Sequence, residues 1–343
     1  MDVITRISTL PRVRLGHYPT PLEPLPRLTQ ALGGPPVWIK RDDALGPALG
    51  GNKTRELEFL FGEALQRRAQ AVATFGGLQS NFARQMCAAA QATGLEPHCF
   101  YFAPRPARLE GNLLLAQIMG ARLHFIPFGG GEAGGLTLEQ AIQLVRWIAR
   151  LTPDLWGKQT YFMPVGGHTT VGCLGYVLAA LELDEQLHEQ GIQRATIVVA
   201  AGTGGTLAGL LAGLQLGNRP HRLIGIDVGK LWRGFPASIA ALAAATCAML
   251  DHPHRFTAAE APIIERTYVG AGYAKPSPGG LDALRRLARH EGILLDPVYT
   301  CKAMAGLIDL IQRGAVPPDQ PLVFWHTGGL PALWAYGKEL AIG

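Results

Sequence analysis

One lysine stands where the chain could present an amine to a ligand. Lys53 follows Gly50, Gly51 and Asn52, and it precedes a segment, 54–68, whose apolar residues recur at the spacing of an amphipathic helix. A lysine fixed on a helix and approached through glycines can form a Schiff base with a carbonyl compound, provided that it loses its proton easily. A solvated surface lysine beside a turn would have the same local sequence. The rest of the chain must decide between the two.

Two glycine-rich segments follow predicted strands and open predicted helices. The first contains Gln79, Ser80 and Asn81, which place polar side chains and backbone N–H groups at a helix N-terminus, as an anion or carboxylate site would. Ser80 or Asn81 could equally be a simple N-cap. The second, 201–206, alternates glycine with threonine, and it lacks the Gly-Lys-Ser/Thr of a P-loop. A single phosphate is therefore a better prediction for it than a nucleoside triphosphate with Mg²⁺.

A third glycine-rich segment, 128–135, contains the G-x-G-x-x-G pattern of a dinucleotide site. The next helix starts only near Thr137, a natural N-cap, so a pyrophosphate on the glycines would not meet the helix N-terminus. We predict a flexible surface loop here, with the dinucleotide site as the alternative.

Composition excludes several classes of function. Hydrophobic residues make up 48% and charged residues 17%, which is typical of a globular protein. The net charge of +5 comes from scattered basic residues, which predicts no nucleic-acid surface. The five cysteines have no metal-ligand spacing, and we expect reduced thiols, a cytoplasmic protein and no metal site. No signal peptide is visible in 1–16, and the longest apolar run, Ile239 to Leu250, is too short to span a bilayer.

Strand-like and helical periods alternate along the chain, which predicts an α/β fold with mainly parallel sheets. The predicted strands lie near 37–40, 71–75, 98–102, 122–128, 196–200, 222–226 and 322–325. The predicted helices lie near 54–68, 82–93, 109–119, 138–151, 172–189, 206–216, 281–291, 302–312 and 330–340. No linker separates two halves, so we predict a discontinuous larger cofactor-binding domain, 1–54 and 166–343, and a smaller inserted α/β domain, 55–165.

Taken together, the motifs resemble those of the family of D-cysteine desulfhydrase and 1-aminocyclopropane-1-carboxylate (ACC) deaminase. These are pyridoxal-phosphate enzymes of the tryptophan-synthase-β fold type. The matching motifs, in chain order, are 20–23, 39–43, 50–53, 79–81, 164–167, 296–299 and 326–329. The resemblance runs nearly end to end, and it implies a two-domain fold type II enzyme with open, twisted, mainly parallel sheets flanked by helices. It also implies a homodimer.

The resemblance assigns cofactor contacts to residues of this chain. Lys53 would form the Schiff base with pyridoxal 5′-phosphate and later act as the base at the substrate Cα. The phosphate cradle would be Thr203, Gly204, Gly205 and Thr206. Asn81 would bond to the pyridine 3-oxygen. Thr300 would face the pyridine nitrogen, and a threonine hydroxyl can donate to that nitrogen in its unprotonated form.

The same resemblance assigns residues to the substrate, an amino acid. Gln79 and Ser80 would face its carboxylate, with Asn81 beside them. Tyr273 and Tyr299 match the two active-site tyrosines of the family, and together with Lys53 and Ser80 they complete the expected catalytic set. His168 and Thr327 are the remaining candidates for substrate contact, and His168 could instead be a structural histidine.

Two threonines determine which reaction we predict. ACC deaminases resemble this chain but carry Glu where Thr300 stands and Leu where Thr327 stands. We therefore predict a β-eliminating lyase that converts D-cysteine or a related β-substituted amino acid to pyruvate, ammonia and sulfide. Departures from the desulfhydrase pattern at Phe82, at 168–169 and at Cys301 leave L-cysteate sulfo-lyase open, and ACC deaminase is a further alternative. The alternative from another class is a non-catalytic protein of the same fold that binds a phosphorylated ligand.

Overall fold

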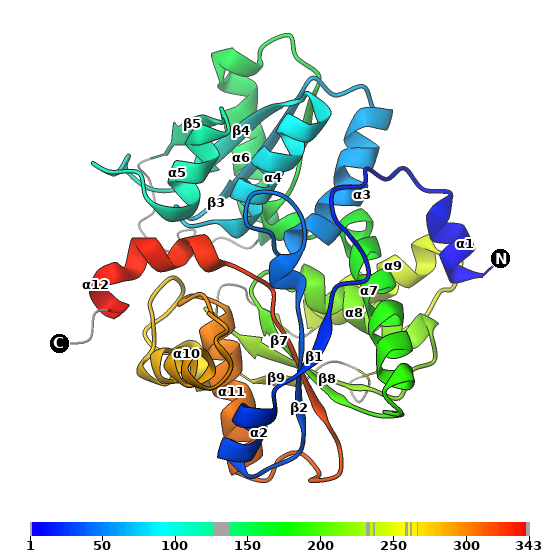
Figure 1. Cartoon of the computed structure of the whole chain (residues 1–343). Coiled ribbons are helices and arrows are strands. Elements are labelled where there is room, and N and C mark those ends of the chain that lie inside the picture. The colour runs from blue at the N-terminus through cyan, green and yellow to red at the C-terminus, as the bar shows by residue number, and fades with distance from the viewer. Residues whose placement is uncertain are drawn as a thin grey trace.

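Two mainly parallel sheets organise the chain, one in the lower and one in the upper part of Figure 1. The computed structural model describes residues 2–126, 138–230, 234–235, 237–257, 260, 263–265 and 267–340. The predicted G-x-G-x-x-G loop therefore lies outside the described residues.

The larger sheet has six strands in the order β1-β2-β10-β7-β8-β9. β1 pairs antiparallel with β2, and every other pairing in this sheet is parallel. Its strands are β1 (Leu22–Pro24), β2 (Val37–Lys40), β7 (Thr196–Ala201), β8 (Arg222–Asp227), β9 (Ile263–Glu265) and β10 (Leu322–Trp325). The central strand β10 is buried along its whole length, because helices cover both faces of the sheet.

Helices pack on each face of the larger sheet and form two hydrophobic cores. One face carries α7 (Thr170–Glu189), α8 (Gly205–Leu216) and α9 (Ala237–Met249). The other face carries α2 (Pro26–Leu32), α10 (Pro278–Glu291) and α11 (Thr300–Gln312). Glycines allow α8 to lie close to α7: a Cβ at Gly209 would come within 2.6 Å of the Cys173 carbonyl oxygen.

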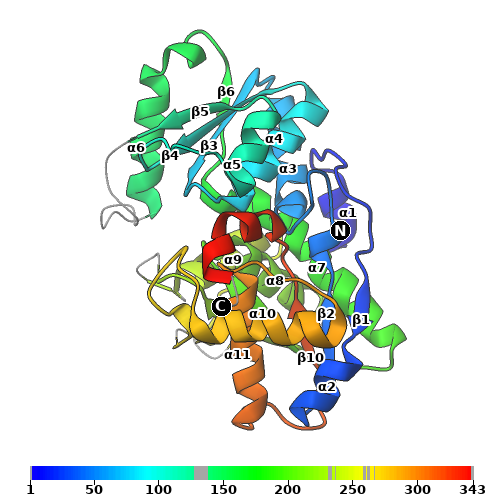
Figure 2. The ribbon, with the colours of Figure 1, turned by 60° about the vertical axis from the view of Figure 1, so that its left-hand side comes forward.

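The smaller sheet has four parallel strands in the order β5-β4-β3-β6. They are β3 (Ala71–Gly76), β4 (Glu96–Tyr101), β5 (Arg122–Phe125) and β6 (Thr160–Phe162). α3 (Lys53–Gln66), α4 (Asn81–Thr93) and α5 (Gly111–Ile118) contribute to the core on one face, and α6 (Leu138–Leu151) to the core on the other. Figure 2 shows α3 joining this upper unit to the lower one. All four strands lie inside the predicted insertion, 55–165, whose boundaries stay a prediction.

The α/β fold with mainly parallel sheets is confirmed, and several short elements were missed. These are α1 (Val3–Ser8), α2, α9, β1, β6 and β9. The predicted helix 330–340 is instead a 3₁₀ helix, Leu330–Tyr336, followed by one α-helical turn, α12 (Gly337–Leu340). Further 3₁₀ turns are Asp42–Ala44, Pro153–Leu155, Val165–Gly167 and Thr267–Val269. Within the described ranges, no helix combines the length and apolarity needed to cross a membrane.

Candidate active site

A cavity of about 160 Å³ lies where the ends of β3 and β7 face each other between the two sheets. It gathers most of the residues singled out in the sequence. Those that line it are Lys53, Ser80, Asn81, Thr203, Gly204, Gly205, Thr206, Tyr273, Tyr299 and Thr327, with Asn52, the Gly76-Gly77 turn and Gly166. Gln79, His168 and Thr300 are not among the described residues that line it.

Lys53 is the first residue of α3, and its amine points into the cavity wall formed by the loop at Gly166. Its Nζ donates to the Gly166 carbonyl at 3.0 Å and lies 2.7 Å from Glu56 Oε2. The preceding loop is fixed by the Asn52 N–H, which donates to the Thr327 carbonyl at 3.0 Å. Gly51 has φ +131°, and a Cβ there would lie 3.1 Å from the same carbonyl oxygen, so the loop requires glycine at this position.

The N-terminus of α8 forms a cradle for an anion. Gly204 has φ +90° as the N-cap of this helix, so the first backbone N–H groups of α8 face the cavity. A Cβ at Gly205 would make only ordinary van der Waals contacts, the nearest 3.5 Å away, so a small side chain there would not clash with the fold. The Thr206 hydroxyl donates to Glu56 Oε1 at 2.9 Å and accepts from Asn52 Nδ2 at 2.9 Å.

The two tyrosines meet across the cavity. Their hydroxyls share a hydrogen bond, and the rings are edge to face with centroids 5.8 Å apart. Tyr273 contacts the Gly76-Gly77 turn, where a Cβ at Gly77 would lie 3.6 Å from its ring, and Tyr299 lies beside Gly202. Burial raises the pKa of both phenols, so both are protonated at neutral pH and can donate a proton.

The polar loop before α4 splits into two parts. Ser80 is the N-cap, because its Oγ accepts the Ala83 N–H at 3.2 Å, and it also lines the cavity with Asn81. The Gln79 side chain turns away: its amide nitrogen donates to the Glu110 carbonyl at 3.0 Å and its oxygen accepts the Asn112 N–H at 2.9 Å. In this arrangement Gln79 orders a neighbouring loop, and its contact with a substrate carboxylate stays a prediction.

The Thr300 hydroxyl is occupied by the cap of α11. It lies 2.7 Å from Asp296 Oδ1, and because a carboxylate only accepts, the hydroxyl must donate its proton there. It also accepts the Asp296 N–H at 2.8 Å. Donation to a pyridine nitrogen would require that proton to leave Asp296, so the predicted role of Thr300 as a donor is not supported by this geometry. Its position next to the ring stays a prediction.

His168 follows the Val165–Gly167 turn, and its Nδ1 is buried without a hydrogen-bond partner among the described residues. Burial, and then the charge of Lys53, lower its pKa to about 4. His168 is therefore neutral at physiological pH. It adds no positive charge to the site, and its predicted contact with substrate is untested.

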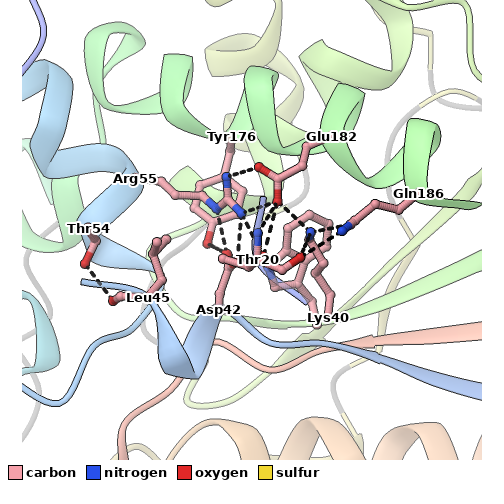
Figure 3. A network of polar contacts seen from close by, with 10 residues as sticks. Thr20, Lys40, Asp42, Leu45, Thr54, Arg55, Tyr176, Glu182 and Gln186 are labelled. Atoms are coloured by element: carbon pink, nitrogen blue, oxygen red, sulfur yellow. Dashed lines mark hydrogen bonds and ion pairs between the residues drawn. The ribbon is translucent and has the colours of Figure 1, made fainter. Parts of the chain in front are cut away.

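A buried network of charged and polar side chains lies around Arg55, in the first turn of α3 (Figure 3). Arg55, two residues after Lys53, pairs with Asp42 at 2.9 Å and with Glu182 of α7 at 2.8 Å. Lys40 of β2 pairs with the same Glu182, so two cations face two carboxylates. Tyr176 and Trp325 also donate to Asp42 Oδ2, at 2.7 and 2.8 Å. The network connects the first turn of α3 to β2, β10 and α7, and so holds the backbone at Lys53 in place.

Sequence reasoning missed this network and also missed Glu56. The signal available was charge inside an amphipathic helix: Arg55, Glu56 and Glu58 fall among the buried positions of α3. Charged residues are rarely fully buried unless they are paired. The distant partners on other elements could not be read from local spacing.

Comparisons with known proteins identify the family of the chain. Residues 13–328 match the family model described as pyridoxal-phosphate dependent enzyme. The chain belongs to this family. A D-cysteine desulfhydrase of Klebsiella pneumoniae is 39% identical over 344 residues, which cover 98% of this chain and 99% of that protein. A D-cysteine desulfhydrase of Salmonella schwarzengrund is 39% identical over 337 residues, covering 96% and 97%.

Solved structures show the same fold. A structure described as an ACC deaminase homologue superposes with a TM-score of 0.87 at 33% identity, covering 99% of this chain and 98% of that one. An O-ureido-L-serine synthase superposes with a TM-score of 0.64 at 16% identity, covering 96% and 92%, which supports the fold alone. The predicted fold type and the dependence on pyridoxal phosphate are thereby confirmed.

The residues present fit pyridoxal phosphate. Gly204, Gly205 and Thr206 at the α8 N-terminus line the cavity and suit the phosphate, and Lys53 lies in the same cavity. When bound, the cofactor supplies an aldehyde for a lysine amine and a ring that stabilises negative charge at the Cα of an amino acid. Among the described residues, no group of three or more His, Cys, Asp or Glu side chains is placed to hold a metal ion.

Gly205→Val should weaken cofactor binding far more than folding. Its side chain would add bulk at the first residue of α8, beside the expected phosphate, while the nearest atom to its Cβ lies at 3.5 Å, an ordinary van der Waals distance. We expect at least about a tenfold loss of cofactor affinity, because the phosphate loses its close approach to the backbone. Fluorescence titration of the apoprotein measures the affinity, and thermal unfolding of the apoprotein measures stability. An unchanged affinity would place the phosphate elsewhere.

Proposed function

We propose that this protein is a carbon–sulfur lyase that eliminates the β-substituent of D-cysteine or a related amino acid and releases pyruvate, ammonia and sulfide. The observation that carries this proposal is one cavity that holds an amine, Lys53, and two protonated phenols, Tyr273 and Tyr299. β-Elimination needs a base at Cα and an acid at the leaving group, and this pair of groups supplies both. The similarity to two D-cysteine desulfhydrases over nearly the full length supports the same substrate class.

The chain's own residues would divide the reaction as follows. Lys53, once released as a neutral amine, takes the Cα proton. One of the two phenols, both protonated because burial raises their pKa, is placed to give its proton to the departing sulfur. Ser80 and Asn81, at the N-terminus of α4, hold the substrate carboxylate. Thr327 also lines the cavity, and we expect it to contact the substrate.

Pyruvate release tests the reaction. We expect wild-type protein to form pyruvate from D-cysteine and β-chloro-D-alanine at least about tenfold faster, in kcat/KM, than it forms α-ketobutyrate from ACC. The reason is that a thiolate or chloride departs readily from the β-carbon once Cα is deprotonated, whereas a ring carbon is a poor leaving group. Lactate dehydrogenase coupling follows pyruvate, and L-cysteate and L-cysteine serve as matched comparisons.

Other outcomes of that assay select the alternatives. Faster turnover of ACC than of every β-substituted amino acid would favour ACC deaminase, a possibility that the similarity to an ACC deaminase homologue keeps open. Fastest turnover of L-cysteate with sulfite release would favour a sulfo-lyase. No turnover of any amino acid by protein that contains cofactor would favour the non-catalytic, ligand-binding alternative.

We further propose a homodimer that works in the cytoplasm. All five cysteines are free thiols and buried, which suits a reducing compartment. The dimer rests on the family resemblance, and light scattering of the purified protein measures it directly. A mass near that of one chain would exclude the dimer.

A further inference from the structure

Glu56 is a buried carboxylate in direct contact with the lysine amine. It lies one helical turn after Lys53 on α3, and its Oε2 is 2.7 Å from Lys53 Nζ. Its Oε1 accepts the Thr206 hydroxyl at 2.9 Å, and the residue has no exposed surface. Lys53 Nζ also donates to Oε1 at 3.0 Å, and among the described residues Oε2 has no hydrogen-bond partner apart from its ion pair with Lys53.

Other groups around Glu56 provide no competing charge. The titratable or charged groups that face it from neighbouring elements are Lys53, Asp42, Arg55, His168, Cys173 and Tyr176. Asp42 is paired with Arg55, and His168 is neutral because its pKa is lowered to about 4. Burial raises the pKa of Cys173 to about 12 and also that of Tyr176, so both stay protonated. Within the described part of the chain, Lys53 is thus the cation available to this carboxylate.

The environment of Glu56 makes the two side chains interdependent. Burial raises the pKa of the Glu56 carboxyl, while the Lys53 charge and the hydrogen bonds from Lys53 and Thr206 oppose that rise. A buried carboxylate without a cation is costly, so the ionised form of Glu56 favours a protonated nitrogen beside it. Thr206 orients the carboxylate from the α8 N-terminus, where the phosphate is expected to bind.

We propose that Glu56 is a positioning residue that orients Lys53 and stabilises the ammonium ion formed when Lys53 takes the Cα proton, an inference that rests on the proposed function of Lys53. In that step the Cα–H bond breaks, its electron pair stays on the substrate, and the proton joins the neutral Nζ. The new positive charge then lies beside the Glu56 carboxylate. A buried aspartate orients and stabilises the histidine of a serine-protease triad by the same physical arrangement.

Glu56→Gln keeps the shape of the side chain and removes its charge. We expect kcat to fall at least about tenfold with KM within about threefold of wild type, because Glu56 acts through Lys53 and not on the substrate. A second readout needs no substrate: absorbance follows the protonation of the nitrogen that joins Lys53 to the cofactor. A carboxylate stabilises the protonated form, so its loss should lower the titration midpoint by about one pH unit.

Two further variants complete the experiment. Glu63→Gln, on the same helix but bonded to Arg67 and Tyr161, should leave both the midpoint and kcat unchanged. Glu56→Asp keeps the charge, and it should retain a midpoint above that of Glu56→Gln. If Glu56→Gln does not fold, the aspartate variant carries the test, with an expected midpoint between wild type and the value predicted for Gln.

The outcomes separate this inference from the proposed function. A variant at Glu56 that binds cofactor through Lys53 with an unchanged titration midpoint overturns the inference and leaves the lyase proposal intact. A wild-type protein whose cofactor absorbance is independent of Lys53 overturns the proposed function itself.

Discussion

Lys53→Ala should lose the absorbance of the lysine-bound cofactor and about 10³-fold or more in kcat. Schiff-base linkage requires the amine, and removal of a general base costs roughly 10²- to 10⁴-fold by itself. The predicted phosphate cradle, Thr203 to Thr206, would stay intact in this variant, so cofactor should still bind, but without the covalent link and with lower affinity. Absorbance spectroscopy after gel filtration and the pyruvate assay measure the two effects.

The matched control for this variant is Lys338→Ala, which removes an exposed lysine on α12. We expect it to keep wild-type absorbance and activity. Pyruvate formation by Lys53→Ala at a rate near wild type would mean that another group is the base, and borohydride reduction followed by peptide mapping would locate the lysine that carries the cofactor.

Arg55→Met should destabilise the folded protein by about 3–5 kcal/mol, because it leaves buried carboxylates without their main cation. Arg55 is 2% exposed, and it bonds to Asp42 and Glu182 on two other elements. Arg67→Met is the control on the same helix: its guanidinium is 61% exposed and pairs with Glu63, so we expect a loss of at most about 1 kcal/mol. Urea unfolding of the two apoproteins measures both values. Equal losses would show that the network around Arg55 contributes no more than a surface pair.

Arg55→Met should also make the protein more sensitive to acid. Burial alone would raise the pKa of Asp42, but Arg55 and then Lys40 hold it below its ordinary value in the folded state. A carboxyl whose pKa is depressed on folding contributes stability above its ordinary pKa, and this contribution is lost as the pH falls toward the folded value. Without Arg55 the depression is relieved, so acid unfolding should begin at a higher pH than in wild type.

Local pattern was enough to predict most of the fold, whereas the role of Lys53 rests on the family resemblance and stays a prediction. Apolar alternation located the long helices and the central strands, because these elements are buried and periodic. Short edge elements such as β1 and β9 were missed, since three residues carry too little periodicity. The sequence showed Ile239 to Leu250 only as an apolar run, yet most of this run lies in α9, which packs against the larger sheet.

For the site, the sequence and the resemblance named residues that line one cavity, but they did not predict where every side chain points. Ser80, Tyr273 and Tyr299 line the cavity together with Lys53. Gln79 and Thr300 have side chains turned to partners at Glu110 and Asp296, and those bonds depend on how loops pack. The contacts of Glu56 could not be predicted from local sequence, because its partner Thr206 lies 150 positions away and only the fold brings the two together.

The position of β10 in the larger sheet limits when that sheet can form during synthesis on the ribosome. β10 is the last strand in the chain, yet it pairs with both β2 and β7 and stands between them. Until residues 322–325 have emerged, β2 and β7 are left with open edges that other chains can join. The upper sheet needs only residues 71–162, so its four strands can pair earlier than those of the larger sheet. The loop before Lys53 also depends on the Thr327 carbonyl, so the amine that we propose as the base can take up its position only after residue 327 has been synthesised.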